Sequence, residues 1–186
     1  ARLSILILHR VTTVPDPLFP GEMDAKRFDA MCHWISRYFN VLPLDDALER
    51  LRCGALPSRA MCITFDDGYA DNLTVAVPIL LRHGLTATVF VSTGFLDGGR
   101  MWNDTIIEAV RVVRGPSLNL HCLGLLGIAE LPVGTLVEKR KAVHALLGRA
   151  KYLALDVRRQ LADDLRAAVG ADLLLDLMLT SAQVRS

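Results

Sequence analysis

The chain has 186 residues, of which 52% are hydrophobic, and its 21 basic and 20 acidic side chains leave a formal net charge of +1. This length and apolar content predict one globular domain with a sizeable core. The balanced charge argues against a nucleic-acid-binding stripe and a polybasic membrane patch. No apolar run reaches the roughly 18 residues of a membrane span, and no signal peptide is visible, which favours the cytoplasm.

The four cysteines show neither a Cys-x-x-Cys pair nor a zinc-finger spacing with histidine. Cys62 falls within an apolar run, where a free thiol behaves as a small hydrophobic group. We interpret all four as unpaired thiols, which favours a reducing compartment: Cys32, Cys53, Cys62 and Cys122.

The first predicted element is a strand over residues 4–8, an almost unbroken aliphatic run of the kind that is covered on both faces. It ends at His9, and three prolines make the stretch 12–21 a loop. A helix is then predicted from the capping residue Asp24 to about Tyr38, with His33 within it as a partly buried structural histidine.

A short extended piece at residues 41–42 precedes a second helix, capped by Asp45 and running to Arg52. Residues 61–65 then form an apolar strand that ends in Asp66, Asp67 and Gly68. Consecutive side chains on a strand point to opposite faces, so the two carboxylates can share one site only if the backbone turns there, as glycine permits.

A helical pattern over residues 70–82 ends at His83, and residues 86–92 predict a third buried strand. Strands that alternate with helices in this way predict a parallel sheet with right-handed crossovers. Functional groups of such sheets gather at the carboxyl ends of the strands, where His9, Asp66 and Asp67 all fall.

The second part of the chain is rich in leucine and predicts mainly helices. A helix opens at Trp102, a loose hairpin follows over residues 117–128, and two helices cover about 135–152 and 156–169. A last helix begins from the cap Thr180. We therefore divide the chain into residues 1–114, the N-terminal part of an α/β domain, and 115–186, a mainly helical insertion with the start of the domain's next helix.

Two neighbouring carboxylates are costly unless a cation or a proton separates them. A divalent metal is the natural third member, with one carboxylate binding it and the other acting as a base. Asp-Asp-Gly after a strand is also a common turn composition. A phosphotransferase of the haloacid type would need Asp-x-Asp, which the adjacent Asp66 and Asp67 do not form.

The context of the acidic pair resembles the first signature of the polysaccharide deacetylases (NodB homology, carbohydrate esterase family four). Residues 64–68, Thr-Phe-Asp-Asp-Gly, are followed by Tyr69, Asp71 and Asn72 and later by the strand 87–91. The resemblance covers about ninety residues and corresponds to the N-terminal portion of these enzymes. It implies an α/β fold, a partial or irregular (β/α) barrel with parallel strands.

The resemblance also implies an activity, the removal of acetyl groups from amino sugars of a polysaccharide by a metal-dependent hydrolase. It makes Asp67 a ligand of a divalent metal, usually zinc, and Asp66 the base that deprotonates water. His9, Tyr69 and Trp102 are implied as substrate-binding or supporting residues. The implied partner is an acetylated polysaccharide or oligosaccharide.

This sequence departs from the family in one respect that matters for the metal. The family takes two zinc ligands from a later His-x-x-x-His motif, and no two of the five histidines here have that spacing. One aspartate is a poor zinc site, so we expect weak metal binding by this chain. The alternative to an enzyme is a catalytically incomplete relative that binds glycan or a protein partner through the same strand ends.

Overall fold

The computed structural model describes residues 2–120, 128–169, 173 and 177–185. The chain divides into two compact units. Unit 1 comprises residues 1–16, 20–98 and 176–186, and unit 2 comprises residues 17–19 and 99–175. The division after residue 98 differs from the predicted one after residue 114, because the helix that begins at Trp102 packs within unit 2.

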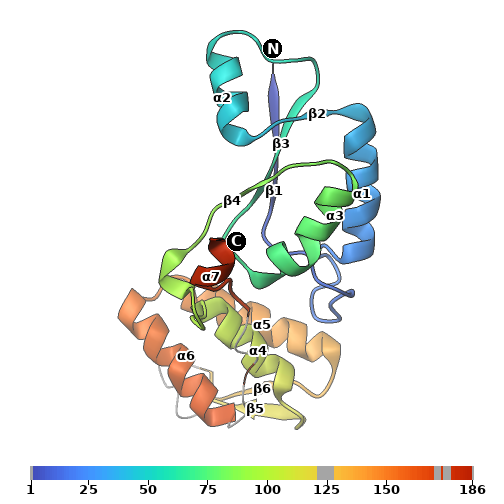
Figure 1. Cartoon of the computed structure of the whole chain (residues 1–186). Helices are drawn as coiled ribbons and strands as arrows, with labels where there is room; N and C mark the ends of the chain where they lie inside the picture. The colour runs from blue at the N-terminus through green and yellow to red at the C-terminus, as the bar shows by residue number, and fades with distance from the viewer. Residues whose placement is uncertain (1, 121–127, 170–172, 174–176, 186) are drawn as a thin grey trace. The chain divides into compact units, whose positions relative to one another are not determined.

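Unit 1 is built on four parallel strands (Figure 1): β1 (Leu3–Leu8), β2 (Asn40–Val41), β3 (Ala60–Phe65) and β4 (Thr88–Val89). β3 pairs with β1 along its whole length, with β2 at its first two residues and with β4 at its last two. Since a strand has only two edges, β2 and β4 share the edge of β3 that β1 does not occupy. The predicted parallel order is confirmed.

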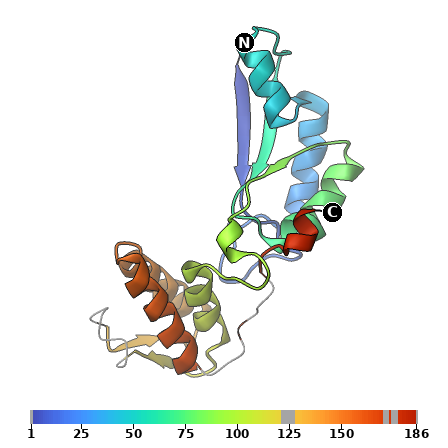
Figure 2. The same ribbon diagram turned by 60° about the vertical axis from the view of Figure 1, so that its left-hand side comes forward.

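Between β1 and β4 the chain forms four helical segments: α1 (Ala25–Tyr38), α2 (Leu44–Arg52), the π-helix η1 (Asn72–Ala76) and α3 (Val77–Arg82). α1 and α3 lie on the same face of the sheet (Figures 1 and 2). Their apolar sides meet Ile63 and Phe65 of β3 in the core of unit 1. β3 is thereby anchored just before the end that carries Asp66 and Asp67.

Local sequence explains where these helices begin. The Asp24 side chain accepts a hydrogen bond from the Arg27 backbone at 3.1 Å, which confirms it as the cap of α1. The predicted cap of α2 is wrong: Pro43 occupies that position without a side-chain bond, and Asp45 lies in the first turn. There its negative charge complements the helix dipole.

Several predictions of burial are also wrong. Ile5 and Ile7 of β1 are 47% and 58% exposed, because they lie on the sheet face opposite α1 and α3. β4 has two residues instead of the predicted seven, and Phe90 is exposed immediately after it. His33 is exposed on α1 rather than partly buried.

The described residues of unit 2 form three helices and a short hairpin: α4 (Trp102–Val112), β5 (Ser117–Asn119), β6 (Glu130–Pro132), α5 (Leu136–Ala150) and α6 (Leu155–Val169). The predicted helices and the antiparallel hairpin are present, although residues 121–127 of the hairpin lie outside the described part. The core of unit 2 is largely aliphatic and includes Leu120, Leu146, Leu161 and Leu165.

Two further short helices belong to unit 1, one after β4 and one in the final segment of the chain, residues 176–186. The 3-10 helix η2 (Thr93–Phe95) follows β4, and α7 (Ser181–Val184) starts from Thr180. A capping box between Thr180 and Gln183 confirms the predicted helix start. The fold-class prediction, a partial α/β structure with parallel strands and a helical C-terminal half, is confirmed.

The described cysteines, Cys32, Cys53 and Cys62, are free thiols as predicted, while Cys122 lies outside the described residues. Burial raises the pKa of the Cys32 thiol to about 11 and raises that of Cys62 as well. Among the described helices, none is long and apolar enough to cross a membrane.

Candidate active site

The acidic turn, residues Asp66 to Gly68, follows β3 directly. Asp67 has φ = +74° and Gly68 has φ = +80°, so the backbone turns there, as it must if both carboxylates are to share one site. A positive φ is uncommon for a residue with a side chain, and holding one there costs on the order of 1–3 kcal/mol. Surrounding contacts must therefore hold Asp67 in place.

Three separate segments hold the backbone of this turn. The Asp66 amide donates to the Leu8 carbonyl at 2.9 Å, and the Ser92 amide donates to the Asp67 carbonyl at 3.0 Å. The Leu179 amide donates to the Gly68 carbonyl at 2.9 Å. The turn is thus fixed by the end of β1, by the segment after β4 and by the segment before α7.

Gly68 is also fixed by packing. A Cβ built on it would lie 3.0 Å from Val91 Cγ1 and 3.3 Å from Val91 Cα. Only glycine satisfies both this contact and φ = +80°. The turn is therefore a closely packed structure rather than a loose loop.

The two carboxylates are partly exposed at the end of the sheet. Within the described residues, neither the Asp66 nor the Asp67 side chain has a hydrogen-bonding or ion-pairing partner. Acidic side chains held on a rigid backbone without a protein partner are available to a ligand or to water. This arrangement can supply a base or a metal ligand.

A neighbouring ion pair was not anticipated from the sequence. Arg10 Nε donates to Asp71 Oδ2 at 2.8 Å, and the Val11 amide donates to Asp71 Oδ1 at 3.3 Å. Burial raises the pKa of Asp71 above its ordinary value, although Arg10 opposes the rise. The signal available in the sequence was position: Arg10 and Asp71 each follow a strand of one parallel sheet.

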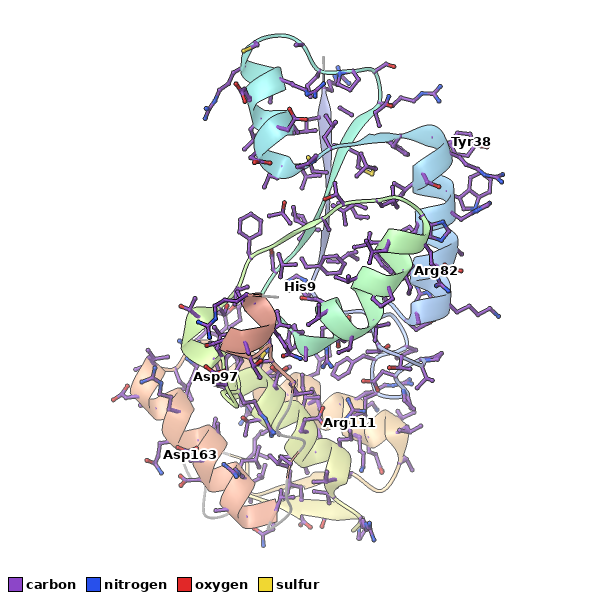
Figure 3. All side chains as sticks on the ribbon, in the orientation of Figure 1. His9, Tyr38, Arg82, Asp97, Arg111 and Asp163 are labelled. Atoms are coloured by element: carbon purple, nitrogen blue, oxygen red, sulfur yellow. The ribbon has the colours of Figure 1, made fainter. Side chains whose placement is uncertain are left out.

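The predicted supporting residues fall in different places. His9 is exposed at the carboxyl end of β1, where Figure 3 labels it. Tyr69 is 4% exposed, and the Arg10 guanidinium lies 4.7 Å from its ring centroid. Trp102 belongs to unit 2, where it packs against the core and Arg158 lies 5.3 Å from its ring centroid.

The donor groups do not fit a complete zinc site. Zinc in proteins takes three or more protein ligands as a rule. In the part of the chain that the structure describes, no group of three His, Cys, Asp or Glu side chains could hold a metal ion. Asp67 and Asp66 could supply at most part of a ligand set.

Comparison with known proteins shows that the sequence around this turn resembles one protein family. Residues 54–113 match the sequence profile of the polysaccharide deacetylase family, and this stretch contains the whole acidic turn. A Bacillus subtilis protein, YxkH, provisionally named a polysaccharide deacetylase, is 31% identical over 93 residues. That alignment covers 49% of this chain and 32% of YxkH, so the chain spans about a third of the length of this relative.

Solved structures similar to the chain include a de-N-acetylase from Aggregatibacter actinomycetemcomitans, with 27% identity and a TM-score of 0.43 over 51% of this chain and 39% of that one. The Streptococcus pyogenes deacetylase PplD, solved with acetate, shows 18% identity and a TM-score of 0.48 over 90% and 82% of the two chains. The predicted resemblance to the N-terminal portion of polysaccharide deacetylases is confirmed by the family match.

Proposed function

We propose that this chain, which matches the polysaccharide deacetylase family over residues 54–113, is part of a hydrolase that removes acetyl groups from amino sugars of a polysaccharide. One observation carries the proposal: two carboxylates that pair with no described residue stand on a rigid, strained turn at the carboxyl end of a parallel sheet. Active sites of parallel α/β folds are built at this end.

In this proposal Asp66 acts as the general base. Its carboxylate takes a proton from a water molecule, whose oxygen then bonds to the acetyl carbonyl carbon. The bond between the carbonyl carbon and the sugar nitrogen then breaks, the nitrogen takes the proton that Asp66 removed from water, and acetate and an amino sugar leave. Partial exposure lets Asp66 reach a bound polymer, and the bonds to Leu8, Ser92 and Leu179 keep the turn from moving away.

Asp67 is proposed as a ligand of a divalent metal, zinc being the first candidate because of the family resemblance. Since the described residues do not complete a zinc site, no chemical step is assigned to a metal here. Titration of the chain with zinc, monitored by calorimetry, is expected to show weak binding. Tight stoichiometric binding that Asp67→Ala abolishes would contradict the incomplete donor set.

Of the supporting residues, His9 is proposed to approach the substrate because it is exposed beside the turn. Tyr69 is proposed to support the turn from beneath, since it is buried under Arg10. Trp102 stays a predicted substrate-binding or supporting residue, by resemblance alone. Its packing in unit 2 equally suits a core anchor.

A second candidate is a catalytically incomplete relative that binds glycan or a protein partner. It is favoured by the lack of a three-donor metal group among the described residues. Both candidates use the same strand ends, but only the enzyme needs the base.

The test is acetate release from acetylated chito-oligosaccharides and from other acetylated polysaccharides, with zinc present. Asp66→Asn is expected to abolish release while leaving the melting temperature unchanged. Asp46→Asn, which alters an exposed acid on α2, is the matched control and should leave release unaffected. Release that survives Asp66→Asn would overturn the base assignment, and oligosaccharide binding without any release would favour the second candidate.

A further inference from the structure

The end of β1 contacts the acidic turn on both sides. The Leu8 carbonyl accepts from the Asp66 amide where the chain enters the turn. The His9 carbonyl accepts from Asn72 Nδ2 at 2.9 Å, just after the chain has left it. The next residue, Arg10, donates to the Asp71 carboxylate at 2.8 Å and lies over the ring of Tyr69.

This ion pair differs from the exposed pairs of the same chain. The side chains of Arg10 and Asp71 are 27% and 11% exposed. Those of Arg50 and Asp46, which form an Nε–Oδ1 bond of the same 2.8 Å within α2, are 46% and 38% exposed. The first pair joins two strand ends 61 residues apart, whereas the second joins successive turns of one helix.

Burying such a pair is not an efficient way to gain stability. Removing charges from water costs several kcal/mol per ion, and replacing a buried pair by uncharged side chains is often neutral. The raised pKa of Asp71 agrees that burial outweighs the attraction of Arg10. The pair can instead fix the orientation of the groups that it joins, because a guanidinium donates hydrogen bonds in a fixed plane.

We propose that Arg10 and Asp71 are positioning residues for Asp66 and Asp67, a proposal that rests on the function assigned above to these carboxylates. The guanidinium joins Asp71 to the face of Tyr69 and so fixes the segment that leaves the turn against β1. Asp67 is thereby kept at its positive φ, and the two carboxylates keep one orientation toward a substrate.

The test is hydrogen exchange in the intact chain, measured by NMR on Arg10→Gln, Arg10→Lys and the neutral pair Arg10→Gln with Asp71→Asn. The reporting amides are those of Ser92 and Leu179, which donate to the turn. Arg10→Gln should raise their exchange about tenfold, because the turn opens more often. The amide of Cys32, in the core of unit 1, should keep its rate.

Three controls separate positioning from general stability. Arg50→Gln removes the matched exposed pair and should change none of these rates. Arg10→Lys keeps the charge and should restore part of the protection, and the neutral pair should melt near the wild-type temperature yet still exchange rapidly at the turn.

Acetate release gives an independent reading. In active protein, Arg10→Gln should lower kcat about tenfold or more with little change in KM, as misplacement of a catalytic group does. Unchanged exchange at Ser92 and Leu179, or an equal rise at Cys32, would overturn the positioning role. Inactive wild-type protein with the predicted exchange pattern would overturn the proposed function alone.

Discussion

The chain contains the dipeptide Asp-Gly twice with a positive φ at both residues, at residues 67–68 and at residues 97–98. Asp67 and Asp97 have φ values of +74° and +59°, and Gly68 and Gly98 have +80° and +94°. Their surroundings differ. The Asp97 carboxylate accepts from the amide and the hydroxyl of Ser181, with an N–O distance of 2.7 Å, and Figure 3 shows it beside α7.

Asp67 has no such partner among the described residues, although its turn is held far more closely. A Cβ added to Gly98 would meet nothing within 4 Å, whereas one added to Gly68 would meet Val91. The same local sequence therefore serves two purposes. At residue 97 the side chain stabilises the fold, and at residue 67 the fold holds a side chain that bonds to none of the described residues.

The largest effect is expected from Gly68→Ala compared with Gly98→Ala. Both add a Cβ at positive φ, which costs about 1–2 kcal/mol. Only at residue 68 does the Cβ also press on Val91, so we expect Gly68→Ala to lower the free energy of unfolding by about 3 kcal/mol or more. Urea unfolding of the two variants measures the difference, and equal losses would show that Val91 yields at no cost.

A smaller effect, of opposite sign at the two positions, is expected from replacing the two aspartates by glycine. Asp67→Gly relieves strain and removes no side-chain hydrogen bond to a described residue, so stability should be unchanged or should rise by up to about 1 kcal/mol. Asp97→Gly relieves similar strain but loses the bonds from Ser181, and stability should fall. Thermal unfolding of both variants checks this.

The same pair of variants separates stability from function. Asp67→Gly should lose whatever zinc binding the chain shows, while Asp97→Gly should keep it. A loss of stability in Asp67→Gly comparable to that in Asp97→Gly would indicate that the Asp67 carboxylate has a structural partner in solution.

The smallest effect concerns pH. Hydrogen bonds from Ser181 lower the pKa of Asp97, so its stabilising contribution is present above the unfolded value of 3.8 and is lost as the pH falls through the folded value. Burial raises the pKa of Asp71, so its contribution is greatest below 3.8 and is lost as the pH rises through the folded value.

The difference in melting temperature between wild type and Asp97→Asn should therefore shrink on acidification below about pH 4. The difference in melting temperature between wild type and Asp71→Asn should instead shrink as the pH rises above that value. Parallel changes in the two comparisons would contradict the environments described for these carboxylates.

Much of unit 1 follows from local sequence. Apolar runs bounded by turn residues predicted β1 and β3, Asp24 predicted the start of α1, and their alternation predicted parallel strands. Gly68 after two acids indicated the reversal. These features depend on short-range chemistry, which a single sequence contains.

Features that depend on distant contacts could not be predicted in this way. The exposure of Ile5 and Ile7 depends on which sheet face the helices cover, and the division after residue 98 depends on the packing of α4. The Arg10–Asp71 pair joins segments whose register is set only by the paired strands. The roles of Asp66 and Asp67 stay predictions that rest on resemblance and on the geometry of the turn.

The bonds between the acidic turn and the segment before α7 have a consequence for synthesis. The Gly68 carbonyl and the Ala70 amide find their partners, Leu179 and Leu177, only about 110 residues later in the chain. At ribosomal rates of roughly 5–20 residues per second, these two groups await their partners for on the order of 5–20 s. During that interval β3 can already pair with β1, while the turn that carries the carboxylates still lacks its hydrogen bonds to Leu177 and Leu179. A chain shortened to end before residue 177 should therefore be more sensitive to protease at this turn than the chain of 186 residues.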